Sequence, residues 1–283
     1  GDDDFSFSVP GLSRFRVNAY RQRGSLAAVI RVIAFELPNP DILHIPEDVM
    51  STADFTKGMV LVTGPAGSGK STTMACLVDK INHSREGHII TLEDPLEYLH
   101  RHDRCIVSQR EICTDTESYL VSLRATLRQS PDVILLGEMR DYETIQTAMT
   151  AAETGHLVLS SLHTIGAVNT IGRIVDVFEP SQQRQISIQL SMVLQAVISQ
   201  QLVPDVEGHN IPVFEVMRLN PAIRNMIRDN KVHQIDGVIS SSAHEGMRSM
   251  DQSLLELFRQ NRITKETALK YAANADMLKR KLL

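Results

Sequence analysis

The sequence predicts an α/β fold in which helices cover a parallel sheet. From about residue 57, four short apolar runs (MVLVT, HIITL, DVILL and HLVLS) alternate with segments of helical periodicity. This alternation is typical of a buried parallel sheet. A glycine-rich loop directly follows the first run, and acidic residues follow the next two. We therefore expect a ligand site at the carboxyl ends of these strands.

Composition narrows the class of protein. Of 283 residues, 42% are hydrophobic and 22% are charged, which excludes disordered and collagen-like chains. The net charge of −5, from 29 Lys and Arg against 34 Asp and Glu, argues against bulk binding to nucleic acid or anionic membrane. The longest apolar runs, of about five residues, fall far short of the ~20 that span a bilayer. Three cysteines, an odd and sparse set, predict free thiols in a reducing compartment.

The first block of the chain reads as strands. Apolar residues alternate from Phe5 to Val9 and from Phe15 to Ala19, with a turn signal at Pro10 and Gly11 between them. A short helix is predicted around Ser25 to Arg31. Two strands cannot bury a core alone. We therefore expect this block to pack on the larger part, or to be the end of a domain whose earlier residues lie upstream, and we favour the second.

A linker and a larger part follow. The stretch LPNPDILHIPED carries three prolines and predicts a linker. Beyond Pro180 the chain is expected to be mostly helical. The apolar residues that carry this prediction are spaced by three and four, at Ile186, Leu190, Val193, Leu194 and Val197.

A phosphate-binding loop is the most specific motif. Residues 64–71 read GPAGSGKS, between a predicted strand and a predicted helix, as the motif requires. Glycines let backbone N–H groups surround phosphate oxygens, and the helix N-terminus adds a positive dipole end. The predicted nucleotide-binding residues are Gly64, Pro65, Ala66, Gly67, Ser68, Gly69, Lys70, Ser71 and Thr72.

Acidic residues supply what hydrolysis needs, a carboxylate for water and oxygens for a metal. Glu138 ends the apolar strand DVILLGE, with Gly137 where an aspartate often precedes the glutamate. A second cluster, ITLEDPLE, follows another strand, and Pro95 forces its acids Glu93 and Glu97 onto a loop at the same sheet edge. A solvated acidic turn is the alternative for this cluster.

Histidines and arginines offer weaker signals. His156 and His163 bracket the strand LVLSSL, and His163, at its carboxyl end, could contact a γ-phosphate. Arg124 and Arg128 lie four apart on a predicted helix, so they share one face and could serve a subunit interface. A zinc site is disfavoured because the spacing of its potential ligands, which are His100, His102, Cys105 and Cys113, fits no usual set.

Together these segments resemble the secretion and type IV pilus family of hexameric ATPases. Its four boxes occur in order: GPAGSGKST (Walker A), ITLEDPLEY (Asp box), DVILLGEMRD (Walker B) and TGHLVLSSLHT (His box). The resemblance, from about Phe5 to Leu283, implies a P-loop (RecA-like) motor domain over residues 57–283 with a helical part from about 181. Residues 1–37 would be the truncated C-terminal part of a PAS-like domain, and residues 38–56 a linker. Ala66, and TIGA after His163, depart from the family pattern without removing a catalytic group.

The resemblance also implies roles. Lys70 and Ser71 would hold the phosphates of ATP and Mg²⁺. Glu138 would polarise the attacking water and contribute to the metal site, and Glu97 would assist with metal or water, with Glu93 the less favoured acid.

Two histidines of the His box and two arginines of the first block complete the implied site. His163 and His156 would sense the γ-phosphate or link neighbouring sites. Arg16 and Arg31 would reach the nucleotide across a domain or subunit boundary.

One segment indicates the direction of the motor. Residues 222–229 resemble the pilus-retraction signature AIRNLIRE, and the segment also reads as an amphipathic helix. It comprises Ala222, Ile223, Arg224, Asn225, Met226, Ile227, Arg228 and Asp229. The resemblance thus implies a hexameric ATPase that powers type IV pilus retraction, the depolymerisation of pilin in twitching motility. It would be cytoplasmic and peripheral at the inner face of the cytoplasmic membrane, with a pilus platform protein, and a paralogous retraction ATPase as a further candidate, as partners.

Three alternatives stay open. A pilus-extension or secretion ATPase of the same family is disfavoured because the chain lacks the tetracysteine zinc site usual in pilus-assembly ATPases. An accessory nucleotide-binding subunit is disfavoured because Lys70, Glu138 and His163 are all present. A DNA translocase is disfavoured by the acidic net charge.

Overall fold

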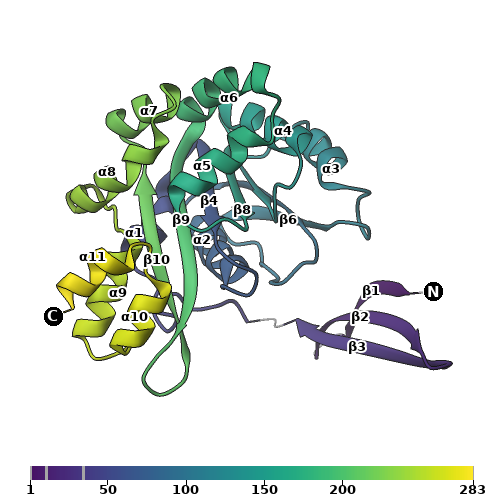
Figure 1. Cartoon of the computed structure of the whole chain (residues 1–283). Coiled ribbons are helices and arrows are strands. Elements are labelled where there is room, and N and C mark those ends of the chain that lie inside the picture. Colours follow the sequence, from purple (N-terminus) through teal and green to yellow (C-terminus); the bar gives the residue numbers. More distant parts are fainter. Residues whose placement is uncertain (1, 10–11, 34–35, 283) are drawn as a thin grey trace.

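The chain forms two sheets of different kind (Figure 1). The computed structural model describes residues 2–9, 12–33 and 36–282. A three-stranded antiparallel sheet comes first, with the order β1 (Asp3–Val9), β2 (Ser13–Gln22) and β3 (Ser25–Ile33). The strand predictions for β1 and β2 are confirmed, and the turn signal at Pro10 and Gly11 lies outside the described residues.

The second sheet has seven strands in the order β10-β9-β4-β8-β7-β5-β6. Its strands are β4 (Gly58–Thr63), β5 (Gly87–Glu93), β6 (Cys105–Glu111), β7 (Val133–Leu136), β8 (Leu157–Leu162), β9 (Leu194–Pro204) and β10 (Asn210–Arg218). All neighbours pair in parallel except β9 and β10. The predicted α/β class is confirmed, with one antiparallel edge strand in addition.

Helices cover both faces of this sheet because its central strands are apolar on both sides. Met59 and Leu61 of β4 join one core with α3 (Tyr119–Thr126), α4 (Tyr142–Glu153), α5 (Ala167–Asp176), α6 (Pro180–Val193), α7 (Pro221–Arg228) and α8 (Ile235–Ser241). Val60 and Val62 join the opposite core with α1 (Glu47–Met50), the 3₁₀ turn Ser51–Asp54 and α2 (Lys70–Ser84). Figure 1 shows the first helix group gathered on one side of the sheet.

The prediction of helix through Leu194 and Val197 is wrong. Helix α6 ends at Val193, and both residues lie on β9, which pairs with β4 and β10. The apolar spacing fits a helix, but pairing with two neighbouring strands decides the conformation. The remaining chain is helical: α9 (Met250–Arg259), α10 (Lys265–Tyr271) and α11 (Ala275–Lys281) pack on β9 and β10 as a third core.

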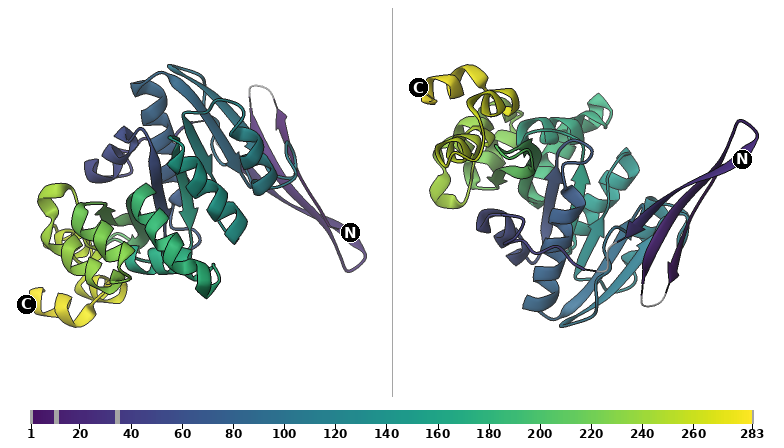
Figure 2. Two further views of the ribbon diagram at one scale, coloured as in Figure 1. Left: turned by 90° about the horizontal axis from the view of Figure 1, so that it is seen from above. Right: turned by 90° about the horizontal axis from the view of Figure 1, so that it is seen from below.

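The prediction of a helix around Ser25 to Arg31 is also wrong, because this segment is β3 and pairs along its whole length with β2. Figure 2 shows the N-terminal sheet beside the β5–β6 edge of the large sheet. Residues 36–46 carry no helix or strand. The rest of the predicted linker 38–56 is not an open connection, because α1 and the 3₁₀ turn Ser51–Asp54 bury Val49, Met50 and Ala53 in the core of the large sheet. That the first sheet belongs to a PAS-like domain stays a prediction.

The N-terminal sheet has two unlike faces, because neighbouring residues of a strand point to opposite sides. Ser6 and Arg14 turn toward the large sheet, where both bond Glu111. The other face carries the exposed apolar side chains Phe5, Phe7, Ile30 and Val32. Across the described residues, no helix has the length and apolarity needed to cross a membrane.

Candidate active site

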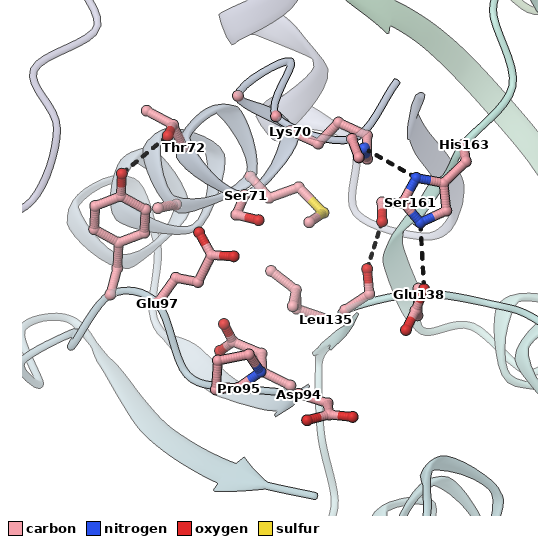
Figure 3. Close-up of a pocket in the computed structure, with 18 of the residues that line it drawn as sticks. Lys70, Ser71, Thr72, Asp94, Pro95, Glu97, Leu135, Glu138, Ser161 and His163 are labelled. Atoms are coloured by element: carbon pink, nitrogen blue, oxygen red, sulfur yellow. Dashed lines mark hydrogen bonds and ion pairs between the residues drawn. The ribbon is translucent and has the colours of Figure 1, made fainter. Parts of the chain in front are cut away.

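A cleft of about 470 Å³ opens at the carboxyl ends of β4, β5, β7 and β8. The residues that line it come from the glycine-rich loop, the acidic loop after β5, the end of β7 and the end of β8 (Figure 3). These elements converge because parallel strands place all their carboxyl ends at one sheet edge. The cleft is therefore the place where the predicted boxes meet.

The glycine-rich loop needs its glycines for two different reasons. Gly67 and Gly69 have φ of 76° and 87°, a region that side chains disfavour. Gly64 lies so close to β9 that an added Cβ would stand 2.1 Å from the carbonyl oxygen of Gln200. The Gln200 side chain also accepts a hydrogen bond from Thr73 at 2.7 Å. Strand β9 thus holds the loop in place, a contribution that no local motif announces.

The side chain of Lys70 extends back to the start of the glycine-rich loop that precedes it. Its Nζ donates to the carbonyl oxygens of Gly64 and Pro65, each at 2.9 Å, and lies 3.5 Å from Nδ1 of His163. Burial lowers the pKa of Lys70, while the carboxylates of Glu138 and Glu97 oppose that shift. The ammonium group is thus held at the loop carbonyl oxygens, within the loop that would surround a phosphate.

Glu138 is the buried acid of the cleft. One carboxylate oxygen pairs with Arg140, and the other lies 3.5 Å from Nε2 of His163. A neutral His163 that accepts at Nδ1 and donates at Nε2 satisfies both of its neighbours. The result is a continuous line from Lys70 through His163 and Glu138 to Arg140 (Figure 3 shows its first three members). Arg140, two residues after Glu138 in the same box, was not singled out from the sequence.

Both acids of the acidic loop line the cleft, with Glu97 exposed and Glu93 half-buried. Glu97 lines the cleft, and Figure 3 shows its carboxylate directed toward Ser71. The Oε1 of Glu93 accepts from Gln109 at 3.4 Å. Burial raises the pKa of Glu93 to about 7. Glu97 is the more exposed of the two acids, and its preference over Glu93 as the acid that reaches a ligand stays a prediction.

The side chain of Tyr119 lies against Gly137, the residue before Glu138. A Cβ on Gly137 would stand 2.7 Å from the hydroxyl oxygen of Tyr119 and 3.4 Å from the carbonyl oxygen of Leu92. An aspartate at this position would therefore have to displace the Tyr119 hydroxyl. Tyr119 lines the cleft, and burial, reinforced by nearby carboxylates, raises its phenol pKa. This steric role was not foreseen from the sequence.

The two candidate arginines of the N-terminal sheet differ in placement. Arg31 lines the main cleft, opposite Arg16 in the β2–β3 register. Arg16 instead pairs with Asp4 at 2.6 Å and lies 4.0 Å from Asp94 of the acidic loop. Arg31 is consequently the one of the two that faces a ligand in the main cleft of this chain.

Three other candidates lie outside the cleft. His156 precedes β8 at the opposite sheet edge, where its Nδ1 bonds the Ala151 carbonyl oxygen at 2.8 Å. Contact with a γ-phosphate in this cleft is therefore ruled out for His156, since a parallel strand directs its two ends to opposite edges. Arg124 lies in the last turn of α3, whereas Arg128 lies in the turn after the helix ends at Thr126, so the predicted shared helix face is wrong. Both are exposed and remain candidates for an interface only.

The 222–229 segment is an amphipathic helix, as its spacing indicates. It contributes α7, capped by the Asn220 side chain, and buries Ile223 and Ile227 while Met226 is partly buried. A separate groove contains Arg228 and Asp229. Among the described residues, Asp205, Glu207 and His209 form the group of three His, Cys, Asp or Glu side chains whose ligand atoms lie close enough to share a metal. His100, His102, Cys105 and Cys113, which the structure also describes, form no such group.

The cleft has the chemistry of a phosphate-transfer site. Loop amides and Lys70 provide positive charge for phosphates, Glu138 provides a carboxylate for water, and Arg31 approaches from a different sheet. This combination could bind and cleave a nucleoside triphosphate.

Comparison with known proteins leads to the same class. The family described as type II/IV secretion system protein matches residues 14–275. The chain is 46% identical over 276 residues to a twitching motility protein of Neisseria gonorrhoeae, covering 97% of this chain and 74% of that protein. It is 45% identical over 267 residues to the type IV pilus retractation ATPase PilT of Pseudomonas aeruginosa, covering 94% and 78%.

Solved structures agree. A crystal structure of the pilus retraction motor PilT with bound ADP superposes with a TM-score of 0.94 at 47% identity, covering 99% of this chain and 80% of that one. The ATPase DotB of Legionella pneumophila superposes with a TM-score of 0.84 at 27% identity, covering 95% and 76%.

Proposed function

Because the chain belongs to the type II/IV secretion system protein family, we propose that it is a motor ATPase whose hydrolysis of ATP powers type IV pilus retraction. The line Lys70–His163–Glu138 at the phosphate loop carries the ATPase part of this proposal. The names of relatives that match nearly the whole chain support retraction as the work performed.

The chain's own groups account for cleavage of the terminal phosphate. The loop amides and Lys70 hold the phosphates and offset their charge. Glu138 polarises the attacking water, with Arg140 and His163 fixing its two oxygens. Arg31 adds positive charge from the N-terminal sheet, so the site is complete only when that sheet is seated.

Mg²⁺ fits the oxygen donors of the cleft. The Ser71 hydroxyl and the Glu97 and Glu138 carboxylates all line it, and Mg²⁺ prefers oxygen ligands. When bound, the ion neutralises charge on the β- and γ-phosphates.

Motion of the two sheets would turn hydrolysis into work. ATP would draw the N-terminal sheet onto the cleft through Arg31, and the segment 36–46 would serve as the hinge. Six such chains in a ring would pass this closure to an inner-membrane platform protein from the cytoplasmic side. A paralogous retraction ATPase is a further candidate partner, and the exposed residues of α7 are a candidate contact for retraction.

The test of catalysis is steady-state ATP turnover against protein concentration. We expect turnover per subunit to rise with concentration as rings form, and Glu138→Gln to retain nucleotide binding while losing about 10²–10⁴-fold in turnover. Glu153→Gln, which changes an exposed carboxylate at the far end of α4, is the matched control. Parental turnover in Glu138→Gln would contradict the catalytic assignment.

Whether the motor drives pilus retraction or pilus extension has to be tested in cells. In a piliated host that lacks its own retraction ATPase, this chain should restore twitching, and Glu138→Gln should leave the cells piliated and immobile. Restored pilus assembly without twitching would indicate an extension motor instead.

A further inference from the structure

Glu111, at the carboxyl end of β6, joins three separate segments. It is 4% exposed. Its Oε1 accepts from Ser6 at 2.9 Å and from Thr114 at 3.1 Å. Its Oε2 accepts from Arg14 at 3.1 Å and from the backbone N–H of Leu96 at 3.1 Å. Both oxygens are thus shared between the N-terminal sheet and the catalytic part.

The Leu96 contact reaches the catalytic acid. Leu96 lies between Pro95 and Glu97, and Glu97 lines the nucleotide cleft. The loop is also held at its start, since Glu93 pairs with Glu111 in the parallel register of β5 and β6. A shift of the Glu111 carboxylate would therefore move the backbone that carries Glu97.

The contact between Glu111 and Arg14 links this carboxylate to the N-terminal sheet. Arg14 and Ser6 lie on one face of two neighbouring strands, because Arg14 pairs with Ser8 and Arg16 pairs with Ser6 in the β1–β2 register. The Arg14–Glu111 pair is well shielded, with side chains 18% and 6% exposed. A second cleft, of about 190 Å³, lies between the sheet residues Arg16 and Arg31 and the acidic loop. Across this cleft the sheet and the loop can approach each other.

Resting on the ATPase function proposed above, we propose that Glu111 is a positioning residue that sets the Glu97 loop according to whether Arg14 and Ser6 of the N-terminal sheet are seated. When the N-terminal sheet is seated, Arg14 and Ser6 fix the Glu111 carboxylate, and this carboxylate fixes the backbone amide of Leu96. Glu97 then faces Ser71. Withdrawal of the sheet releases Arg14 and slackens the loop. Hydrolysis is thereby tied to closure by a route separate from Arg31.

The test is a cycle of variants assayed for kcat and KM, at protein concentrations where turnover per subunit no longer rises. Arg14→Gln should lower kcat by about 10–100-fold, the cost of misplacing a catalytic group from a distance. The KM for ATP should change less than about twofold, because the phosphate loop is untouched. Arg14→Lys should recover part of the loss. Arg21→Gln, the same change on an exposed site of β2, should match the parent.

The cycle identifies the route. In a Glu97→Gln background, Arg14→Gln should lower kcat by less than about a further twofold, because the effects of residues that act through one another are not additive. A multiplicative loss, or an Arg14→Gln variant that matches Arg21→Gln, would overturn the inference. Thermal unfolding of each variant separates loss of fold from loss of position, and Arg14→Lys replaces Arg14→Gln if the latter fails to fold. A parent chain without turnover would instead contradict the proposed function itself.

Discussion

The two edges of the large sheet differ in chemistry although the same strands form both. At the carboxyl edge, His163 stands between Lys70 and Glu138. At the amino edge, His156 bonds the Ala151 carbonyl oxygen at the end of α4. Six residues of β8 separate these two histidines. The sequence suggests similar roles for them, and the parallel fold assigns a ligand site to one and a helix end to the other.

The largest effect that tests this comparison is expected at His163. His163→Gln removes the group between the ammonium of Lys70 and the carboxylate of Glu138, so turnover should fall about 100-fold, as for loss of one oriented active-site donor. Steady-state ATP turnover at saturating ATP measures it. His156→Gln is the control, and equal losses in the two variants would erase the distinction between the edges.

The next effect concerns Gly137, also at the carboxyl edge. Gly137→Ala places a methyl group 2.7 Å from the Tyr119 hydroxyl, and overpacking of this kind costs about 1–3 kcal/mol of stability. Thermal unfolding and ATP turnover should both report the loss. Adding Tyr119→Phe, which removes the hydroxyl oxygen, should restore most of it.

The control for Gly137→Ala is Gly172→Ala on α5, where an added Cβ meets no atom within 4 Å. It should leave turnover unchanged. If Tyr119→Phe gave no relief, the explanation of Gly137 by the Tyr119 hydroxyl would be wrong.

A smaller effect should appear as pH dependence. The pKa of Glu93 is raised to about 7 in the folded chain, from an ordinary 4.5. Between these values the folded state holds a proton that the unfolded state has lost, so stability falls as pH rises from about 4.5 to about 7 and levels off above.

Glu93→Gln should remove this part of the pH dependence of stability, which amounts to a few degrees in the midpoint of thermal unfolding. Thermal unfolding at several pH values measures it. Glu86→Gln, an exposed acid just before β5, should keep the parental slope. A parental slope in Glu93→Gln would show that another group titrates.

The smallest effect is expected at the amino edge. His156→Gln removes one hydrogen bond to a helix end, so stability should fall by about 1 kcal/mol with ATP turnover unchanged. Chemical denaturation measures the first and the turnover assay the second. A large loss of turnover would mean that His156 serves a neighbouring subunit's site.

The parts of the site that the sequence predicts are those held by neighbours in the chain. Lys70 and Ser71 follow the loop glycines directly, and Glu138 ends the strand that precedes it. Their placement needs only a strand, a turn and a helix, all of which leave local signals.

The parts that the sequence does not predict depend on distant pairing. Gln200 supports the phosphate loop only because β9 lies beside β4, and Glu111 meets Ser6 and Arg14 only because a separate sheet packs there. Four strands, β3, β6, β9 and β10, are not predicted from the sequence. At two of them, β9 and β3, the local pattern favours a helix instead. The apolar spacing near Leu194 fits a helix, and an alanine-containing run near Ser25 does too, until neighbouring strands pair with them.

We expect the apolar face of the N-terminal sheet to affect how copies of the chain associate in solution. Phe5, Phe7, Ile30 and Val32 are each more than two-fifths exposed, and contiguous apolar surface promotes sticking between copies. Scattered light should therefore rise with concentration even without nucleotide. Ile30→Lys should suppress that colloidal clustering while leaving nucleotide-dependent ring assembly intact, which separates the two kinds of association in one titration.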